Sequence, residues 1–527
     1  MDNFKIILFL CNWNPHAAFN TLQEKEYKIP PEVKMIRIPC TGRITKSLLF
    51  KAFEMGADGV ALVGCKPGSC RYGAGTDNSI NNTKDIQNIL ELVGIGKDRM
   101  CLATFLPHES EYLSRFLNDF CNNIKLMGKS PVTVQKGTPE KDNPEKLLTE
   151  IIPSNDVYAC QDCGKCTSSC PIALSAGHYS PRNIVTSIIA GKIDSDKIKD
   201  DIWSCLTCGI CYERCPSGVN FPEFIRELRC NISDKDDRSR YAHGGFFQSI
   251  MRSMTSPDLR PKRWKSLPST IQTDPESKTL FFGGCAPYFD MFFTSLNNVQ
   301  TSNILTDSLK LLNFFDIKPN LLNDERCCGH DLLWSGDKEN FLKLAKLNVD
   351  QINNLGIREL ITACPECYKT IKYDYPKYGI KPDFKVTHIY EFLEQEIDRA
   401  AVVFNKFENR ITYQDSCRLN RDNNIKELPR KLIKRLSVDT FNEMKDSGNS
   451  AICCGNCAWT GCDSCTKALQ VNRIRQAHDT GSNLLVTSCP KCQIHLKCAM
   501  EDPFRAKELN MEIMDLTSVI AETIDWE

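Results

Sequence analysis

The chain has 527 residues, and its 66 Lys and Arg residues balance 66 Asp and Glu residues, so no bulk charge attracts nucleic acid or an anionic membrane. Its length predicts several domains, and no run of about 18 or more apolar residues predicts a membrane span. There are 29 Cys against 8 His, which in a reducing compartment favours iron–sulfur or zinc sites over disulfides.

Residues 1–128 alternate apolar runs with helical patterns, which predicts a small open α/β sheet. The first strand is expected at 4–10, and because no basic segment or cleavage site accompanies it, we expect a cytoplasmic protein. A polar stretch at 129–146 is interpreted as a linker. The remaining predicted strands and helices of this domain are 33–38, 59–63 and 100–105, and 46–54, 84–92 and 110–122.

Residues 150–232 are predicted to form an α-helical, ferredoxin-like domain with two dense cysteine motifs around a helix at 182–190. Each motif has the spacing C-x2-C-x2-C-x3-C-P, which places three thiolates on one cubane and sends the fourth to its neighbour. A pair of zinc knuckles is the alternative, but it does not explain the Pro after the fourth Cys. The predicted ligand sets of two [4Fe–4S] cubanes are Cys160, Cys163, Cys166 with Cys215, and Cys205, Cys208, Cys211 with Cys170.

A second polar stretch at 234–278 leads to a part of the chain that repeats itself. We call residues 278–395 the first repeat and residues 408–527 the second repeat. In each, a strand-like run enters a Cys, a Cys-Cys-Gly motif follows, and a Cys-Pro-x-Cys motif comes later. The distance from the Cys-Cys-Gly motif to the Cys-Pro-x-Cys motif differs by a single residue between the repeats. This match predicts two homologous α/β lobes. The Gly after each Cys pair allows the backbone to turn tightly.

The two repeats resemble the CCG domains in the B subunit of heterodisulfide reductase, and residues 150–527 resemble a form in which the ferredoxin-like C subunit is fused before it. This resemblance implies a noncubane [4Fe–4S] cluster on five thiolates in each repeat, with a disulfide such as CoM-S-S-CoB reduced between the two clusters. The chain would then be a disulfide-reducing oxidoreductase within a complex. The implied ligands are Cys285, Cys327, Cys328, Cys364 and Cys367, and Cys417, Cys453, Cys454, Cys489 and Cys492.

The motifs around Cys11, Cys40, Cys65 and Cys70 resemble the delta subunit of methyl-viologen-reducing hydrogenase. That resemblance implies a [2Fe–2S] cluster and a link between a hydrogenase or formate dehydrogenase and a flavin subunit like that of heterodisulfide reductase. The four cysteines fall at the carboxyl ends of predicted strands, where open α/β sheets gather their sites, so they are the expected ligands. The family usually has a further Cys where this chain has Asn14. A zinc site or a plain docking fold is the alternative.

Other thiols and one histidine have weaker predictions. Cys457, Cys462 and Cys465 could hold a further metal or crowd the second repeat's cluster. His388 is expected to be a packing residue more than a proton donor. No glycine fingerprint for a dinucleotide is present, so flavin and electron bifurcation are assigned to the partner. The remaining thiols are expected to be small buried hydrophobes, namely Cys101, Cys121, Cys230 and Cys498.

The prediction from the sequence is therefore an α/β and α multi-domain protein with two cubane, two noncubane and one [2Fe–2S] cluster. A different class of function stays open at this point. The chain could be an electron-transfer adaptor that couples a hydrogenase or formate dehydrogenase to another acceptor without disulfide chemistry, or its repeats could bind metal for structure alone. Neither hypothesis involves nucleic acid or direct insertion into a membrane.

Overall fold

Two compact units make up the computed structural model, residues 1–137 with 243–265 and residues 138–242 with 266–527. All 29 cysteines lie in the described part of the chain, and all are free thiols. Within that part, no helix has the length and apolarity that crossing a bilayer requires. The described residues are 4–134, 147–192, 195–232, 241–265, 267–296, 299–421, 425–502, 504 and 509–526.

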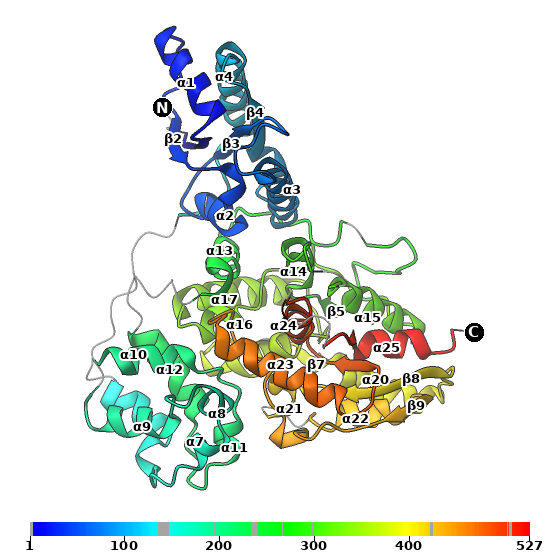
Figure 1. Ribbon diagram of the computed structural model, residues 1–527. Helices are drawn as coiled ribbons and strands as arrows, with labels where there is room; N and C mark the ends of the chain where they lie inside the picture. Colours follow the sequence, from blue (N-terminus) through cyan, green and yellow to red (C-terminus); the bar gives the residue numbers. More distant parts are fainter. Residues whose placement is uncertain are drawn as a thin grey trace. The chain divides into compact units, whose positions relative to one another are not determined.

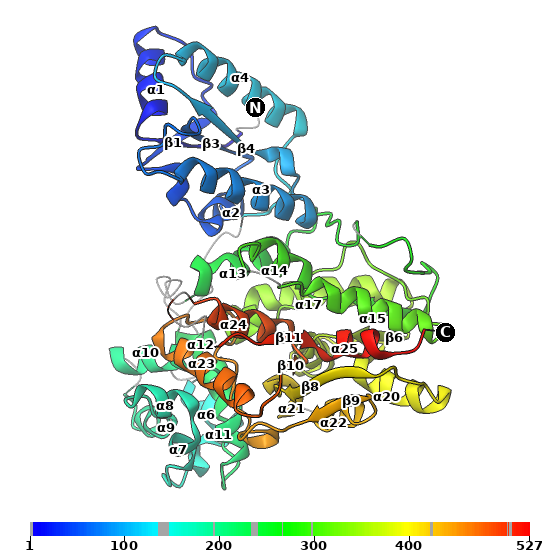
Figure 2. The same cartoon turned by 45° about the vertical axis from the view of Figure 1, so that its right-hand side comes forward.

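The N-terminal unit is built on a parallel sheet with the strand order β2-β1-β3-β4. Its central strands β1 and β3 are almost wholly buried, because helices cover both faces. Helices α1 and α4 pack together on one face, and α2 and α3 lie on the other (Figure 2). The elements are β1 (Ile6–Cys11), α1 (Asn14–Glu24), β2 (Val33–Ile38), α2 (Lys46–Glu54), β3 (Gly59–Cys65), α3 (Gly75–Val93), β4 (Met100–Phe105) and α4 (Ser110–Met127).

A helix from the second polar stretch belongs to this unit. The polar stretch at 234–278 contains a helix that was not predicted, α13 (Phe246–Ser253), whose side chains are all buried and which packs against α2. Phe246 lies edge to face with Phe50 of α2, with ring centroids 5.4 Å apart. The sequence pattern is only eight residues long, which is too short to separate a buried helix from a loop. The predicted linker at 129–146 falls outside the described residues from 135 onward.

The segment that carries the two ferredoxin-like motifs is helical, as predicted, and its helices gather in one group (Figure 1). The cysteine motifs occupy loops and short helices of this group. Its elements are α7 (Lys165–Ser169), α8 (Pro171–Ala176), α9 (Pro181–Ile189), α10 (Asp196–Ser204), α11 (Ile210–Glu213) and α12 (Phe221–Ile232).

The first repeat contains a three-stranded parallel sheet with the order β5-β6-β7. Each strand has four residues and ends at the same edge, where Cys285 lies after β5, Cys364 lies after β6 and His388 is the last residue of β7. The elements are β5 (Thr279–Phe282), α14 (Ala286–Phe292), α15 (Ser302–Phe314), α16 (His330–Trp334), α17 (Lys338–Asn354), β6 (Glu359–Thr362), α18 (Pro365–Lys369), α19 (Tyr375–Lys377), β7 (Lys385–His388) and α20 (Ile389–Ala400).

The second repeat contains a four-stranded parallel sheet with the order β11-β10-β8-β9. It matches the first sheet with one strand added. The last strands of the two sheets correspond, because β7 ends at His388 and β11 ends at Asp515, and each of these residues caps the next helix through its side chain. The elements are β8 (Phe407–Tyr413), α21 (Cys417–Asn420), α22 (Leu428–Ile433), β9 (Val438–Phe441), α23 (Ser464–His478), β10 (Leu484–Thr487), α24 (Pro490–Met500), β11 (Glu512–Asp515) and α25 (Leu516–Thr523).

Candidate metal centres

Four cysteines converge at the carboxyl edge of the N-terminal sheet. Cys11 and Cys65 end the neighbouring strands β1 and β3, and their Sγ atoms lie 3.8 Å apart. Cys40 follows β2, and its Sγ lies 3.9 Å from that of Cys70. A Cβ at Gly75 would lie 2.7 Å from Cys70 Sγ and 2.8 Å from Cys40 Sγ, so only glycine leaves room for both thiols.

The charges of these thiols depend on one another. Burial raises the pKa of Cys40 and raises that of Cys65 to about 12, and the charge of Cys11 adds to both shifts. Burial raises the pKa of Cys70, but hydrogen bonds from the backbone N–H of Tyr72, from the Cys40 thiol and from further backbone N–H groups together outweigh it and lower the pKa. Thiols that oppose one another's ionisation become good ligands when a cation replaces their protons.

Asn14 stands where the resembling family usually has a further cysteine. Its side-chain Nδ2 donates to Ser69 Oγ at 3.3 Å, and its backbone N–H donates to the sulfur of Cys65. The residue therefore supports the site without supplying a ligand. Four thiols remain, and four suffice for a [2Fe–2S] cluster.

The first ferredoxin-like set gathers around one pocket. Cys160, Cys163, Cys166 and Cys215 line it together, and Cys211 of the other set also reaches its wall. The rest of the wall is largely apolar, with Val185, Val219 and Phe221 among its residues. Cys163 is exposed and the other three cysteines of the set are half-buried. Four thiols around one pocket supply the ligands that a cubane needs.

The second ferredoxin-like set is buried in the same group of helices. Burial raises the pKa of Cys170, Cys205, Cys208 and Cys211, and the charge of Cys208 adds to the shift of the other three. Mutual charge effects of this kind require the four sulfurs to lie close together. The structure therefore brings both predicted sets together, including the exchange of the fourth Cys.

The two loops that carry these sets share one backbone conformation. In the first loop Asp162 and Gly164 have positive φ, and in the second loop Thr207 and Gly209 do. The left-handed residues thus fall at the same two places of each motif. Thr207 is β-branched and has a φ of 45°, which is a costly conformation that the surrounding structure must hold.

The first repeat gathers five cysteines at the edge of its sheet. Cys285 lies after β5, and its Sγ is 3.4 Å from that of Cys327. Cys328 has a lowered pKa, because Cys327 and Cys367 donate hydrogen bonds to its sulfur. The charge of Cys364, after β6, also acts on Cys328. All five cysteines implied by the resemblance therefore lie in one group.

The second repeat gathers its five cysteines in the same way. A hydrogen bond to Cys453 raises the pKa of Cys417, and burial adds to the shift. The pKa of Cys454 is lowered to about 6, because Cys453 and Cys492 donate to its sulfur. Cys489 in turn bonds to Cys492. In both repeats, therefore, the pKa of the second member of the Cys-Cys pair is lowered by its neighbours.

The glycine after each Cys pair turns the chain as predicted. Gly329 has a φ of +82° and Gly455 a φ of +93°. A Cβ at Gly329 would lie 2.9 Å from the ring of Phe341, and a Cβ at Gly455 would lie 2.8 Å from the carbonyl oxygen of Thr466. Both positions therefore require glycine for its left-handed backbone and for its lack of a side chain.

The two five-cysteine groups face each other. A hydrogen bond from Cys492 lowers the pKa of Cys489, but burial together with the charges of Glu366 and Cys364 from the first repeat outweighs it and raises the pKa. Helix α18, which begins between Cys364 and Cys367, packs against α21, which begins at Cys417. The edge that carries cysteines in one repeat is thus directed at the same edge of the other.

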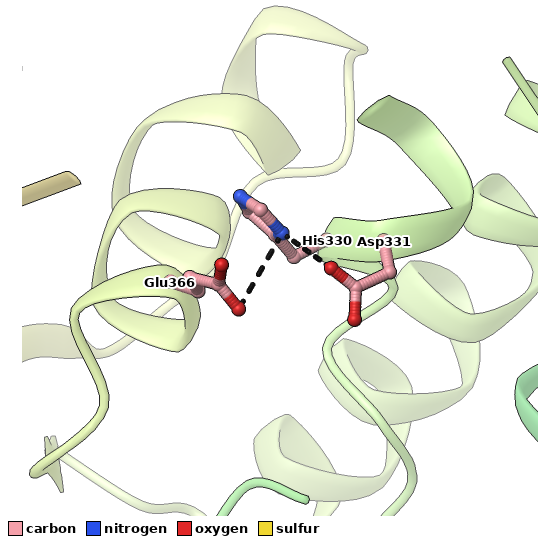
Figure 3. Close-up of side chains that lie close together, drawn as sticks. All are labelled: His330, Asp331 and Glu366. Carbon is pink, nitrogen blue, oxygen red and sulfur yellow. Dashed lines mark hydrogen bonds and ion pairs between the residues drawn. The ribbon is translucent and has the colours of Figure 1, made fainter. Parts of the chain in front are cut away.

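A buried charged group lies between the repeats. His330 Nδ1 is 3.0 Å from Asp331 Oδ1 and 3.7 Å from Glu366 Oε2. Figure 3 shows the imidazole between the two carboxylates. Lys491 of the second repeat bonds to Asp331 and contacts Glu366 Oε2 at 2.6 Å. Burial alone would raise the pKa of Asp331, but Lys491 and His330 hold it well below its usual range. Lys491 thus supplies the cation that the two carboxylates need.

This charged group was missed from the sequence. Glu366 and Lys491 occupy the variable position of the two Cys-Pro-x-Cys motifs, and their opposite charges are the only signal that could have indicated a contact. His495 was also missed. Its Nδ1 lies 3.4 Å from Cys454 Sγ, and burial lowers its pKa to about 3, so the ring is neutral at pH 7.

The structure does not gather Cys457, Cys462 and Cys465 into one group of ligand atoms. Among the described residues, the group of three or more such atoms within 4.8 Å of one another is His330, Asp331 and Glu366. Cys457 is buried, whereas Cys462 is exposed. Of the thiols expected to be hydrophobes, Cys121 is buried, and Cys101, Cys230 and Cys498 are half-buried.

Family models match three parts of the chain. Residues 6–128 match the delta subunit of methyl-viologen-reducing hydrogenase, and residues 156–219 match a 4Fe-4S dicluster domain. Residues 279–372 and 411–497 both match the cysteine-rich CCG domain. The three matches confirm the resemblances predicted from the motifs, and the two CCG matches fall within the two repeats.

Curated relatives cover the same parts. The D subunit of dihydromethanophenazine:CoB–CoM heterodisulfide reductase from Methanosarcina acetivorans is 25% identical over 421 residues, which is 74% of this chain and 98% of the relative. The iron-sulfur D subunit of F420-non-reducing hydrogenase vhc from Methanococcus voltae is 36% identical over 138 residues, 26% of this chain and 94% of the relative. The B subunit of fumarate reductase (CoM/CoB) from Methanothermobacter marburgensis is 26% identical over 368 residues, 68% of this chain and 71% of the relative.

These matches identify an iron–sulfur electron-transfer protein assembled from modules of known redox enzymes. Through residues 6–128 the chain belongs to the family of methyl-viologen-reducing hydrogenase delta subunits, here joined in one polypeptide to a 4Fe-4S dicluster domain and to two CCG domains of the heterodisulfide reductase type.

Proposed function

We propose that the chain is the iron–sulfur subunit of a heterodisulfide reductase-like complex and that a disulfide such as CoM-S-S-CoB is reduced between its two five-cysteine groups. The observation that supports this most strongly is that the groups face each other, with Cys364 near enough to Cys489 for charge on one to act on the other. Cleavage of a disulfide consumes two electrons, and two facing sites give each sulfur its own site.

We assign five clusters to the gathered cysteines. When bound, iron–sulfur clusters exchange single electrons, and their potentials follow the charges, hydrogen bonds and solvent around them. The chain supplies such surroundings through burial and through the backbone N–H groups near Cys70. The assignment is a [2Fe–2S] cluster on Cys11, Cys40, Cys65 and Cys70, cubanes on Cys160, Cys163, Cys166 and Cys215 and on Cys170, Cys205, Cys208 and Cys211, and noncubane clusters on Cys285, Cys327, Cys328, Cys364 and Cys367 and on Cys417, Cys453, Cys454, Cys489 and Cys492.

Residues between the repeats prepare the site for a disulfide. Lys491, Asp331 and Glu366 form a buried group of fixed charges beside Cys364 and Cys489, which holds the two Cys-Pro-x-Cys motifs against each other. His495 contacts the Cys454 sulfur with a neutral ring, so it can share a proton with that sulfur without adding charge.

The partner subunits can be inferred from the families that the parts of the chain match. We propose that the N-terminal unit joins a hydrogenase or formate dehydrogenase to a flavin subunit resembling the one in heterodisulfide reductase. The M. voltae protein, an iron-sulfur subunit of a hydrogenase that the chain matches over 94% of its length, supports a hydrogenase as one partner. The cubane sets would then carry electrons onward within the chain.

Iron content and a substrate-dependent spectrum test this function. Chain purified without oxygen should hold about eighteen irons if all five clusters are filled. Oxidation in the presence of coenzyme M thiol should produce a half-spin electron paramagnetic resonance signal. Cys454→Ala should abolish that signal and lower viologen-driven reduction of the disulfide by about 100-fold or more, because it removes a ligand. Cys498→Ala is the matched control, since Cys498 belongs to none of the five sets.

Three results would argue against the proposal. Zinc in place of iron would remove the basis for electron transfer. Full iron loading without a thiol-dependent signal would favour an adaptor that passes electrons to another acceptor. If Cys454→Ala still reduced the disulfide, the reaction would not depend on the cysteines of the second repeat.

A further inference from the structure

A buried arginine joins the loop of the second cubane set to the second repeat. Arg418 directly follows Cys417 and is 4% exposed. Its Nη1 donates to the carbonyl oxygen of Thr207 at 3.0 Å, and its Nη2 donates to Thr207 Oγ1 at 2.9 Å. Thr207 is the residue with positive φ between Cys205 and Cys208. The guanidinium therefore hydrogen-bonds to the loop of the second cubane set at a residue whose backbone conformation is strained.

The same guanidinium reaches both repeats. Nη2 also lies 3.1 Å from the Sγ of Cys457, which is 2.9 Å from Thr207 Oγ1. The planar group stacks on the ring of Trp334 from the first repeat, with Cζ 3.8 Å from the ring centroid. Arg418 therefore connects the helical segment, the first repeat and the second repeat at one point.

A second arginine strengthens this junction. Arg421 Nη1 donates to the carbonyl oxygen of Cys208 at 2.8 Å, and its Nη2 donates to the carbonyl oxygen of Ala451. Two guanidinium groups thus lie where residues 205–208 meet the second repeat. Arginine stays protonated, so both contribute a permanent positive charge.

These charges act on the cysteines of both sets. Burial raises the pKa of Cys208, while Arg421 and Arg418 lower it and the charge of Cys417 raises it again. For Cys417, the hydrogen bond with Cys453 and burial raise the pKa, and Arg418 and Arg421 oppose them. The sulfurs of the two sets therefore interact with the same arginines and with each other.

We propose that Arg418, assisted by Arg421, is a positioning residue that raises the reduction potentials of the two clusters on either side of it and holds the sites together for transfer of single electrons. The proposal rests on the function proposed above, because it requires a cubane on Cys170, Cys205, Cys208 and Cys211 and a cluster on Cys417 and its four partners. Adding one electron makes a cluster more negative, and a buried positive charge stabilises that reduced form. The step forms no bond and moves no proton.

Potential measurements on the full chain test the proposal. Protein purified without oxygen is reduced stepwise with dithionite, and the midpoint potential of each cluster is followed by electron paramagnetic resonance. Arg418→Gln should make one-electron reduction of both neighbouring clusters about tenfold less favourable, a downward shift of about 59 mV. Arg418→Lys keeps the charge and should shift the potentials by less than half as much. If Arg418 only packed the segments together, the midpoint potentials of intact clusters would be the same in Arg418→Gln as in the parent chain.

Arg410→Gln is the matched control, because it removes an exposed arginine of the same repeat whose Nε bonds to the carbonyl oxygen of Gly481 at 3.0 Å. It should shift neither potential. Iron and sulfide contents separate two failures: parent chain without these clusters defeats the proposed function, whereas full clusters with unshifted potentials in Arg418→Gln overturn this inference alone. Should Arg418→Gln not fold, Arg421→Gln replaces it, and a downward shift supports the inference while an unchanged potential rejects it.

Discussion

His388 caps a helix at the end of β7, in line with the packing residue expected from the sequence. Its Nδ1 accepts a hydrogen bond from the N–H of Tyr390 at 3.3 Å, and its own N–H donates to Glu391 Oε2 at 2.8 Å. Burial lowers its pKa to about 3. The unfolded chain, with a pKa near 6.5, binds the proton more readily, so this residue lowers the stability of the fold as pH falls below about 6.5.

We therefore expect His388→Asn, which keeps a side-chain acceptor at the cap, to be less sensitive to acid than the parent. Between pH 6.5 and 5.5 the loss of unfolding free energy should shrink by about 1 kcal/mol. Thermal unfolding under anaerobic conditions at the two pH values measures it. His478→Asn, at an exposed histidine, is the control. An unchanged difference between the two pH values in His388→Asn would show that the buried ring is not the group that titrates.

At the scale of elements, α13 is bound to the N-terminal unit by a buried ion pair. Glu54 of α2 accepts from Arg252 Nε at 2.7 Å, bonds to Ser249 and contacts Lys51 Nζ at 2.5 Å. Glu54→Gln removes the carboxylate and should destabilise this unit by about 3–5 kcal/mol, because it breaks a buried ion pair by removing one of its charges. Hydrogen exchange of β1 and β3 amides measures the loss.

The control for this ion pair is Glu111→Gln in α4. Glu111 and Arg115 form a pair at 3.7 Å in which both side chains are about two-thirds exposed, so it should contribute less than about 1 kcal/mol. Equal protection of β1 and β3 in Glu54→Gln and Glu111→Gln would mean that apolar packing alone keeps α13 in place.

At the scale of the whole molecule, equivalent positions of the two repeats meet with opposite charges. Glu366 and Lys491 stand at the same place in their Cys-Pro-x-Cys motifs and contact each other at 2.6 Å. Glu366→Lys or Lys491→Glu alone should cost about 3–5 kcal/mol of unfolding free energy, since each buries like charges together. Reversing both charges should restore part of this, and a double-mutant cycle from anaerobic denaturation isolates the coupling.

An exposed pair serves as the comparison for that cycle. Lys385 and Glu359 lie 2.8 Å apart at the surface of the first repeat, and reversing both should change stability by less than about 1 kcal/mol. The unfolding free energy of the double variant is compared with that of the less stable single variant. If it were no higher, the contact between Glu366 and Lys491 would not stabilise the pairing of the two repeats.

Most of the candidate sites could be predicted from the spacing of the cysteines. A run such as that from Cys160 to Cys170 constrains neighbouring thiols through local geometry, so the two ferredoxin-like sets could be predicted without a fold. The structure gathers these sets, and their assignment as ligands stays a prediction. The contacts of Arg418 with Thr207 and of Lys491 with Asp331 could not be predicted, because they join residues 211 and 160 positions apart that no local pattern links.

The sequence by itself determined the chemistry of this protein: the number of its thiols, their grouping in motifs, the internal repeat and the parallel sheets that carry them. Those features depend on residue type and short spacing, which act within a few residues of the chain. That the two five-cysteine groups face each other was expected from the family resemblance and not from the spacing. Only the tertiary structure decided that α13 returns to the N-terminal unit and that charged side chains of the two repeats contact one another. These depend on packing between distant segments, where burial and pairing of charges select one arrangement.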